Sequence, residues 1–221
     1  MPRAIDRIRR EYYGRFGPTG DDVRVRPART VPAGARRYWY CFGGLAFFSA
    51  ILQALSGVFM AFYYQPTPDK AYASVFYISN YVHYGWLIRS IHVWGARLMI
   101  ALVVVHMIRV FVTGSYKHPR EFNWVVGVLL LAVTMAFAVT GDLLPWEQSG
   151  YWSTKSVLAL IGEVPLLGSL LVGLATGGRD LGAAALTRFY ASHIMLLPAV
   201  LTALLLAHFW MVRRQGISRP L

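Results

Sequence analysis

Long apolar segments separated by shorter polar ones dominate the chain, and this pattern predicts transmembrane helices. Four stretches are apolar over about 20 residues or more, the length that a helix needs to cross a hydrocarbon core of about 30 Å. They cover residues 39–63, 86–112, 124–145 and 187–212. The pattern therefore predicts an all-α membrane protein built as a four-transmembrane-helix bundle.

The segments outside these spans differ in character. Residues 146–186, between the third and fourth spans, are too long for a simple turn, and their apolar parts around 151–161 and 165–175 are too short to cross a membrane. We expect two short helices on the membrane surface there. Residues 1–38 are polar and rich in arginine, and they form either a short amphipathic helix or a partly disordered basic tail. The chain thus divides into this basic arm and a four-helix domain, 39–221.

Composition agrees with a membrane location. Of the 221 residues, 56% are hydrophobic and only 14% are charged, against about 25% charged in an ordinary soluble domain. No cleavable signal peptide is evident in the first 38 residues, which hold ten arginines and no long apolar segment. The formal net charge of +12 could suggest nucleic-acid binding, but most of the excess flanks the spans. Anchoring to lipids at the membrane surface explains that charge, so no nucleic-acid partner is expected.

Lysine and arginine are distributed unequally between the two sides of the membrane. Residues 1–38, 113–123 and 213–221 hold ten, two and three of them, whereas residues 64–85 and 146–186 hold one and two. With four crossings the first three segments share one side, and fifteen against three marks that side as cytoplasmic. Both termini are therefore expected in the cytoplasm.

Two spans carry histidines at similar spacings. His92 and His106 are fourteen residues apart, which is about 21 Å of helical rise and close to four turns, so their rings face nearly the same direction. His193 and His208 are fifteen residues apart, or about 22 Å. Because both spans run inward from the non-cytoplasmic side, His92 lies level with His193, and His106 lies level with His208.

Paired imidazoles at two depths predict two haem sites. Facing histidines suit the two axial positions of a haem iron, and such a closed haem is suited to electron transfer. We expect one b-type haem between His92 and His193 on the non-cytoplasmic side, and a second between His106 and His208 on the cytoplasmic side. The alternatives are structural hydrogen bonding between helices and a proton relay, since transporters also line pathways with histidine.

The glycines of the other two spans fit the same scheme. Gly43 and Gly57 are fourteen residues apart in the first span, and so are Gly127 and Gly141 in the third. A porphyrin needs backbone without side chains beside it, and glycine allows that close approach. Spaced glycines alone would more often indicate tight helix packing, but together with the histidines they favour a bundle with two cofactors in its interior.

Arginines near the membrane boundaries would neutralise the anionic haem propionates. Arg89 and Arg188 lie at the non-cytoplasmic ends of their helices, whereas Arg109, Arg120 and Arg213 cluster at the cytoplasmic level. They either bind propionates or line a quinone pocket, or they anchor the helices by extending their side chains to the interface.

Several motifs together point to one family. They are YCFGG at 40–44, GWLIRSIH at 85–92, KHPREFNWVVG at 117–127, TGDLLPWEQSGYW at 140–152, LTRFY at 186–190 and the ending RRQGISRPL. These motifs closely resemble the cytochrome b6 family of short, split cytochromes b, over about residues 32–221. The fifteen-residue gap between His193 and His208 is typical of that branch.

The resemblance implies a subunit of a quinol:cytochrome c or quinol:plastocyanin oxidoreductase that works by a Q-cycle. Quinol would be oxidised near the non-cytoplasmic surface, with one electron passing to a Rieske iron–sulfur protein and the other to the His92/His193 haem. The second electron would pass to the His106/His208 haem and reduce quinone near the cytoplasmic surface, coupled to proton translocation. The host would be a respiratory chain or a photosynthetic membrane.

The same resemblance implies further partners. The family's PEWY-type segment, which lines quinol oxidation, is absent from this chain. A separate three-helix partner like subunit IV would carry it, so the chain would not be active alone. A c-type cytochrome subunit and a homodimeric complex are also implied.

The resemblance gives Cys41 a role. By residue type alone, a lone cysteine near a helix start is most often a small buried hydrophobe, and it cannot form an internal disulfide. In the cytochrome b6 family a cysteine in this YCxGG position carries an extra c-type haem through one thioether bond. A covalent haem at Cys41 is therefore implied, with Arg213 as a propionate partner.

Two residues depart from the family pattern. Arg97, five residues after His92, stands where the family has a small residue, and a charge at that depth normally pairs inward. Asp142 follows Gly141, close to the expected quinol-oxidation region, where an aromatic residue is expected. Either the two pair with each other, or Asp142 takes part in proton exit.

Two other classes of protein share part of this pattern. The di-haem membrane anchor of a formate dehydrogenase or hydrogenase also uses four helices and bis-histidine haems, but a haem at Cys41 speaks against it. A proton-coupled transporter with histidine relays would bind no haem.

Overall fold

The computed structural model describes residues 38–178 and 180–216. The helix or tail expected in the N-terminal arm lies outside these ranges, except for Tyr38. Within them, every regular element is a helix, in agreement with the predicted all-α class.

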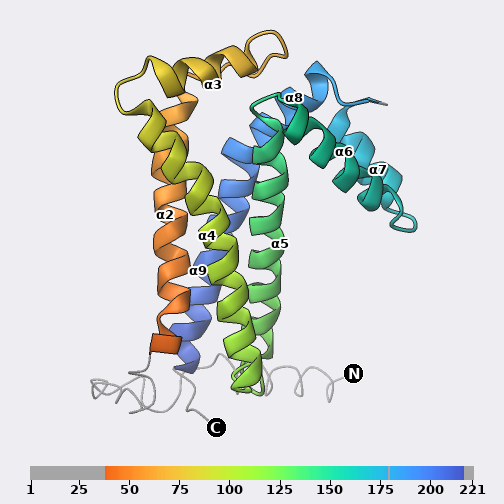
Figure 1. The fold of residues 1–221 in the computed structure, drawn as a ribbon. Coiled ribbons are helices and arrows are strands. Elements are labelled where there is room, and N and C mark those ends of the chain that lie inside the picture. The colour runs from red at the N-terminus through yellow and green to blue at the C-terminus, as the bar shows by residue number, and fades with distance from the viewer. Residues whose placement is uncertain (1–37, 179, 217–221) are drawn as a thin grey trace.

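Four long helices form the body of the molecule, and they run side by side (Figure 1). All four are long and apolar enough to cross a membrane, so the predicted spans are confirmed with small shifts at their ends. They are α2 (Phe42–Ala61), α4 (Gly85–Val112), α5 (Glu121–Leu143) and a continuous fourth helix, Ala183–Gln215. The fourth consists of α8 (Ala183–Ala191), the π-helical turn η3 (Ser192–Leu196) and α9 (Leu197–Gln215).

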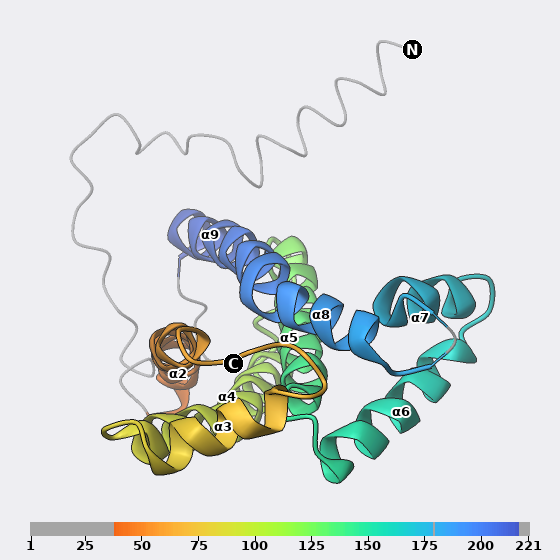
Figure 2. The ribbon, with the colours of Figure 1, turned by 90° about the horizontal axis from the view of Figure 1, so that it is seen from above.

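Short helices gather at one end of the bundle (Figure 1). The two surface helices expected between the third and fourth spans are α6 (Gln148–Gly162) and α7 (Gly168–Thr176). A third, α3 (Ala71–Asn80), connects α2 to α4 and has no counterpart in the sequence-based expectation. Seen along the bundle, α3 and the α6–α7 pair extend from different sides of it (Figure 2).

The turn between α3 and α4 requires glycine. Tyr84, just before α4, has a left-handed φ of 56°. A Cβ on Gly85 would overlap the carbonyl oxygen of Ile78 in α3. The absence of a side chain therefore lets α3 lie directly against the first turn of α4.

The spans pack as two pairs, α2 against α4 and α5 against α9. Buried apolar side chains concentrate where α5, α6 and α8 meet, at Leu143, Leu158 and Phe189. Within the most apolar window of each span only 6% to 11% of the residues are buried. The four spans thus bury few of their own side chains against one another, an arrangement that suits a bundle completed by cofactors and by other subunits.

The end of the bundle opposite these short helices brings together four segments. The 3-10 turn η2 (Tyr38–Tyr40) meets the last turn of α4, where the Arg109 guanidinium lies 3.7 Å from the centre of the Tyr40 ring. The Gln215 amide nitrogen donates to the Pro119 carbonyl at 2.9 Å, and the Arg120 guanidinium donates to the Gln215 carbonyl at 3.3 Å. This is the end that the charge distribution assigns to the cytoplasm.

Candidate functional site

His92 and His193 face each other between α4 and the fourth helix. Their ring centres are 6.3 Å apart and the rings are inclined by 60°. The structure therefore brings this pair together at one depth, as the helical spacing predicts. The separation leaves room for one metal ion bonded to both rings at about 2.0 Å.

A hydroxyl group fixes the orientation of each of these rings. Ser56 Oγ lies 2.9 Å from Nδ1 of His92, and Thr140 Oγ1 lies 2.9 Å from Nδ1 of His193. Each hydroxyl also donates its own hydrogen to a helix carbonyl four residues earlier, at 2.7 Å in both cases. Because that hydrogen is engaged, the oxygen accepts from Nδ1–H, and the proton stays on Nδ1. Nε2 of both rings is therefore left with the lone pair that a metal needs.

Glycine backbone lies against the histidine rings. A Cβ on Gly57 would lie 3.2 Å from Cε1 of His92, and one on Gly141 would lie 2.9 Å from Cε1 of His193. At the other depth, a Cβ on Gly43 would lie 3.0 Å from Cε1 of His106. These three glycines thus give the rings room beside α2 and α5. Their expected contact with a porphyrin stays a prediction.

The second pair, His106 and His208, lies further along the same two helices, toward the end that is expected in the cytoplasm. His106 in α4 and His208 in α9 are close enough to interact electrostatically, as their spacing from the first pair predicts. Gly127 lies on α5, and a Cβ there would meet nothing within 4 Å outside its own chain segment. Its expected place beside a porphyrin therefore stays a prediction.

A π-helical turn places His193 in register with His208. In a regular α-helix, fifteen residues make four turns plus about 60°, whereas fourteen fall about 40° short of four turns. The turn η3 contains His193 and holds one residue more than an α-helical turn. Pro198 follows it within the first residues of α9 and has no N–H to donate to the preceding turn. In the sequence, only the fifteen-residue spacing between His193 and His208 signals this turn. The sequence analysis predicted a regular helix there.

In the described part of the chain, three buried guanidinium nitrogen atoms lack hydrogen-bond partners at the end of the bundle that holds His106 and His208. Among the described residues, Nε and Nη2 of Arg109 and Nε of Arg120 are buried with no hydrogen-bond partner. Arg213 lies in the last turn of α9 at the same end. Buried donors are costly to leave unpaired, and an anionic group such as a haem propionate would satisfy them. The donor set at this end thus fits the predicted cofactor.

The two arginines at the other end already have protein partners. Arg188 donates to the Leu174 carbonyl at 2.7 Å and to the Gly173 carbonyl at 3.4 Å, and so caps the C-terminus of α7. Arg89 donates to Ser79 Oγ at 3.4 Å and links α4 to α3. Propionate or quinone contacts for these two stay a prediction.

Arg97 and Asp142 do not pair. Ser153 of α6 donates a hydrogen bond to the Asp142 carboxylate. The Arg97 guanidinium instead lies 4.7 Å from the centre of the Trp94 ring. No ion pair joins Arg97 to Asp142 in the described part of the chain, so this alternative is wrong. The inward pairing expected for Arg97 is also wrong, because its side chain is exposed.

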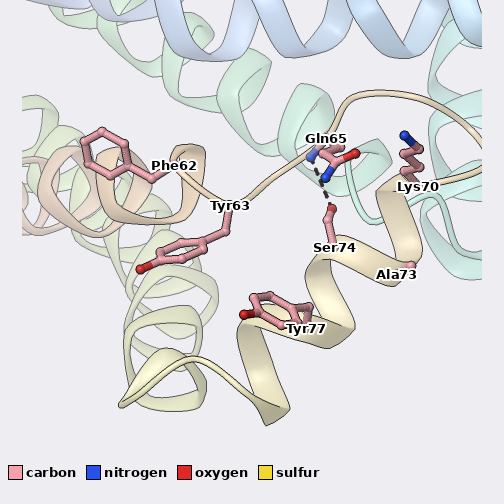
Figure 3. Close-up of a pocket in the computed structure, with 7 residues that line it drawn as sticks. All are labelled: Phe62, Tyr63, Gln65, Lys70, Ala73, Ser74 and Tyr77. Atoms are coloured by element: carbon pink, nitrogen blue, oxygen red, sulfur yellow. Dashed lines mark hydrogen bonds between the residues drawn. The ribbon is translucent and has the colours of Figure 1, made fainter.

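A pocket of about 500 Å³ lies apart from the histidines, at the connection between α2 and α3. Figure 3 shows its lining: Phe62, Tyr63, Gln65, Lys70, Ala73, Ser74 and Tyr77. Beside it, Tyr64 donates to the Leu144 carbonyl at 2.6 Å. Burial, together with the nearby Tyr190 hydroxyl, raises the pKa of Tyr64 well above its ordinary value. Tyr64 therefore stays protonated and holds the α2–α3 connection to the end of α5.

Four helices long and apolar enough to cross a membrane, with two histidine pairs between them, form a framework that could hold metal cofactors in its interior. Residues 29–216 match the family described as Cytochrome b/b6/petB. The chain belongs to this cytochrome b/b6 family, which confirms the resemblance seen in its motifs.

Named relatives agree with this assignment. The chain is 49% identical over 183 residues to cytochrome b6 of Synechocystis sp., covering 83% of this chain and 82% of that protein. It is 48% identical over 183 residues to cytochrome b6 of Oltmannsiellopsis viridis, covering 83% and 85%. A solved chain of a "Hyperthermophilic respiratory Complex III" superposes with a TM-score of 0.79 at 30% identity. All of this chain is covered, but it spans only 56% of that solved chain.

Replacing Thr140 by valine tests the role of the hydroxyl. The change removes the acceptor for Nδ1–H of His193 at nearly constant volume, so we expect haem affinity at this pair to fall about 10- to 100-fold. The measurement is titration of haem into the purified apoprotein, followed by its absorption spectrum. Thr134→Val is the matched control, because Thr134 makes the same hydroxyl bond to a carbonyl four residues earlier, at 2.8 Å, on the same helix. Equal affinities for the two variants would contradict the assigned role.

Proposed function

We propose that the chain is the transmembrane electron-transfer subunit of a quinol oxidoreductase of the quinol:cytochrome c or quinol:plastocyanin type. In this proposal His92 and His193 hold one b-type haem, and His106 and His208 hold the second. The observation that carries it is the facing pair at 6.3 Å, in which both Nδ1 atoms are bound to hydroxyls and both Nε2 atoms are left to a metal. Family membership over residues 29–216 supports the same assignment.

The residues of the chain set the path across the membrane. Each haem, when bound, supplies a one-electron donor and acceptor. The two histidine levels on α4 are separated by about 21 Å of helical rise. An electron crossing a hydrocarbon core of about 30 Å would therefore pass from one haem site to the other instead of crossing in a single transfer. The apolar spans exclude water from the region between the two sites. Moving one charge across the full membrane is worth about 2.3 kcal/mol per 100 mV, which is the energy such a subunit would store by proton translocation.

A covalently attached c-type haem at Cys41 belongs to the same proposal. Cys41 is exposed and precedes the first residue of α2. The preceding residue, Tyr40, has its ring centre 3.7 Å from the Arg109 guanidinium. Gly43, two residues after Cys41, lies against the His106 ring. Cys41 therefore stands, in the chain, between a residue that contacts Arg109 and a residue that contacts His106. Arg213 would serve as a propionate partner.

The proposed complex contains the parts that this chain lacks. A three-helix partner like subunit IV would carry the quinol-oxidation motif, and a Rieske iron–sulfur protein and a c-type cytochrome subunit would receive electrons from quinol. The solved Complex III chain is longer than this one, which covers 56% of it. The complex would be homodimeric and would lie in a cytoplasmic or photosynthetic membrane, with both termini of this chain in the cytoplasm.

The di-haem anchor of another respiratory oxidoreductase is the alternative function. It would use the same four histidines, but the likeness to cytochrome b6 proteins at 48% to 49% identity favours the quinol oxidoreductase.

Replacing single histidines tests the two haem sites. We expect His193→Ala and His208→Ala each to lose one b-type haem, because one axial ligand is removed from one pair. The amplitude of the reduced-minus-oxidised spectrum of the purified complex should fall by about half in each variant. His118→Ala is the control, since this histidine is exposed and contacts Glu121 at 3.5 Å. Two full haems in both ligand variants would rule out the assignment.

Cys41→Ser tests the covalent haem. The wild-type band at 24.8 kDa should stain for haem after denaturing electrophoresis, because a thioether bond survives denaturation. The Cys41→Ser band should not stain, while the b-type spectrum of the native complex persists. Haem staining that is absent from the wild-type band would remove the covalent haem and leave two b-type haems.

Asp142→Asn tests proton exit. The Asp142 carboxylate is exposed next to Gly141 at the non-cytoplasmic end and accepts from Ser153. If it accepts protons released from quinol, the amide should slow quinol oxidation by the complex by about 10-fold or more, most clearly at low pH where other acceptors are protonated. Turnover that matches the wild type across the pH range would exclude this role.

A further inference from the structure

Arg97 places a positive charge near the middle of a membrane span. The helix α4 has 28 residues and is therefore about 42 Å long. Arg97 stands twelve residues after its first residue and fifteen before its last, so its Cα lies within about 3 Å of the helix midpoint. For a helix that crosses the membrane, the Arg97 Cα consequently lies inside the hydrocarbon region and far from both membrane surfaces.

The Arg97 side chain points away from the cofactor sites. Around the axis of α4 it lies about 140° from His92 and about 180° from His106. Its side chain is exposed, and its guanidinium carbon lies 4.7 Å from the centre of the Trp94 ring. Trp94 is itself 66% exposed, and Leu98 beside it is 56% exposed. The outer face of α4 is therefore apolar, with one cation held over an aromatic ring.

The described spans of this chain supply no counter-charge at that depth. Within the four spans the only carboxylates are Glu121, the first residue of α5, and Asp142, the residue before its end. Both stand at the boundaries of the membrane. A charge in lipid is costly, and intramembrane arginines almost always face protein or a water-filled cavity, where they pair with another charged group or with backbone carbonyls.

We propose that the outer face of α4 around Arg97 binds a transmembrane helix of another subunit that carries a carboxylate at mid-membrane depth. A lipid headgroup is a poor counter-charge at this depth, because it would reach Arg97 only through local thinning of the bilayer. A second copy of this chain fits poorly, because a two-fold contact would set the same patch against itself, and no span of this chain brings a carboxylate there. The inference rests on the proposed membership of a multi-subunit complex, and it adds which surface is used and what chemistry the partner presents.

The first experiment isolates the complex through an affinity tag on this chain, with Arg97→Met, Arg97→Lys and a control. Lys155→Met is the matched control, because Lys155 lies 5.0 Å from the centre of the Trp152 ring on the surface helix α6, outside the spans. We expect Arg97→Met to lose at least about 10-fold of one co-purifying membrane subunit, while Arg97→Lys and Lys155→Met retain it. Unchanged recovery of all subunits with Arg97→Met would overturn the proposal.

The second experiment keeps Arg97 intact, so it does not depend on whether Arg97→Met folds. A photo-crosslinking residue, p-benzoylphenylalanine, replaces the exposed Leu98 in the full complex, and the linked peptides are sequenced. We expect links to a transmembrane segment of a different subunit that contains Asp or Glu. Links only to lipid or to a second copy, a partner segment without a carboxylate, or no link to any other subunit would overturn the inference. The b-type spectrum recorded on the same sample reports separately on the proposed function.

Discussion

The hydrogen bonds that the Nδ1 atoms of His92 and His193 make with Ser56 and Thr140 decide what the centre of this bundle can do. Each hydroxyl is committed as a donor to its own helix, so it can only accept from the ring. That requirement fixes both the rotation of the imidazole and the nitrogen that carries the proton. A histidine that merely filled space between helices would need neither, and a proton relay would need a ring free to exchange protons on both nitrogens.

The backbone adapts to keep these rings in place. Glycine at positions 57 and 141 lets the rings lie against α2 and α5 at distances where an added Cβ would be crowded. The π-helical turn around His193 absorbs the extra residue that separates it from His208. Both features depart from regular helix structure or packing, and both hold the histidines in register. Local irregularity of this kind is typical of functional sites. The few buried side chains within the spans are consistent with helices that complete their packing around bound groups.

The sequence was sufficient for the features that depend on periodicity and length. Four apolar stretches predicted four spans, and the spacing of His92, His106, His193 and His208 predicted their pairing in depth. It was not sufficient for hydrogen bonds between residues on different helices that loops bring together. The bond from Ser153 to Asp142, and the capping of α7 by Arg188, depend on how α6 and α7 fold back onto the bundle. The outward direction of Arg97 follows from the way α4 packs against α2 and α5, which hydropathy alone does not specify.

The most direct test of the two-level arrangement is the number of extractable haems per chain. Acid–acetone extraction of the purified complex, quantified against the amount of this chain, should release two b-type haems per copy, because each histidine pair holds one without a covalent bond. One extractable haem per copy would contradict the equivalence of the two pairs. None would contradict the account of the bundle as a haem-binding framework.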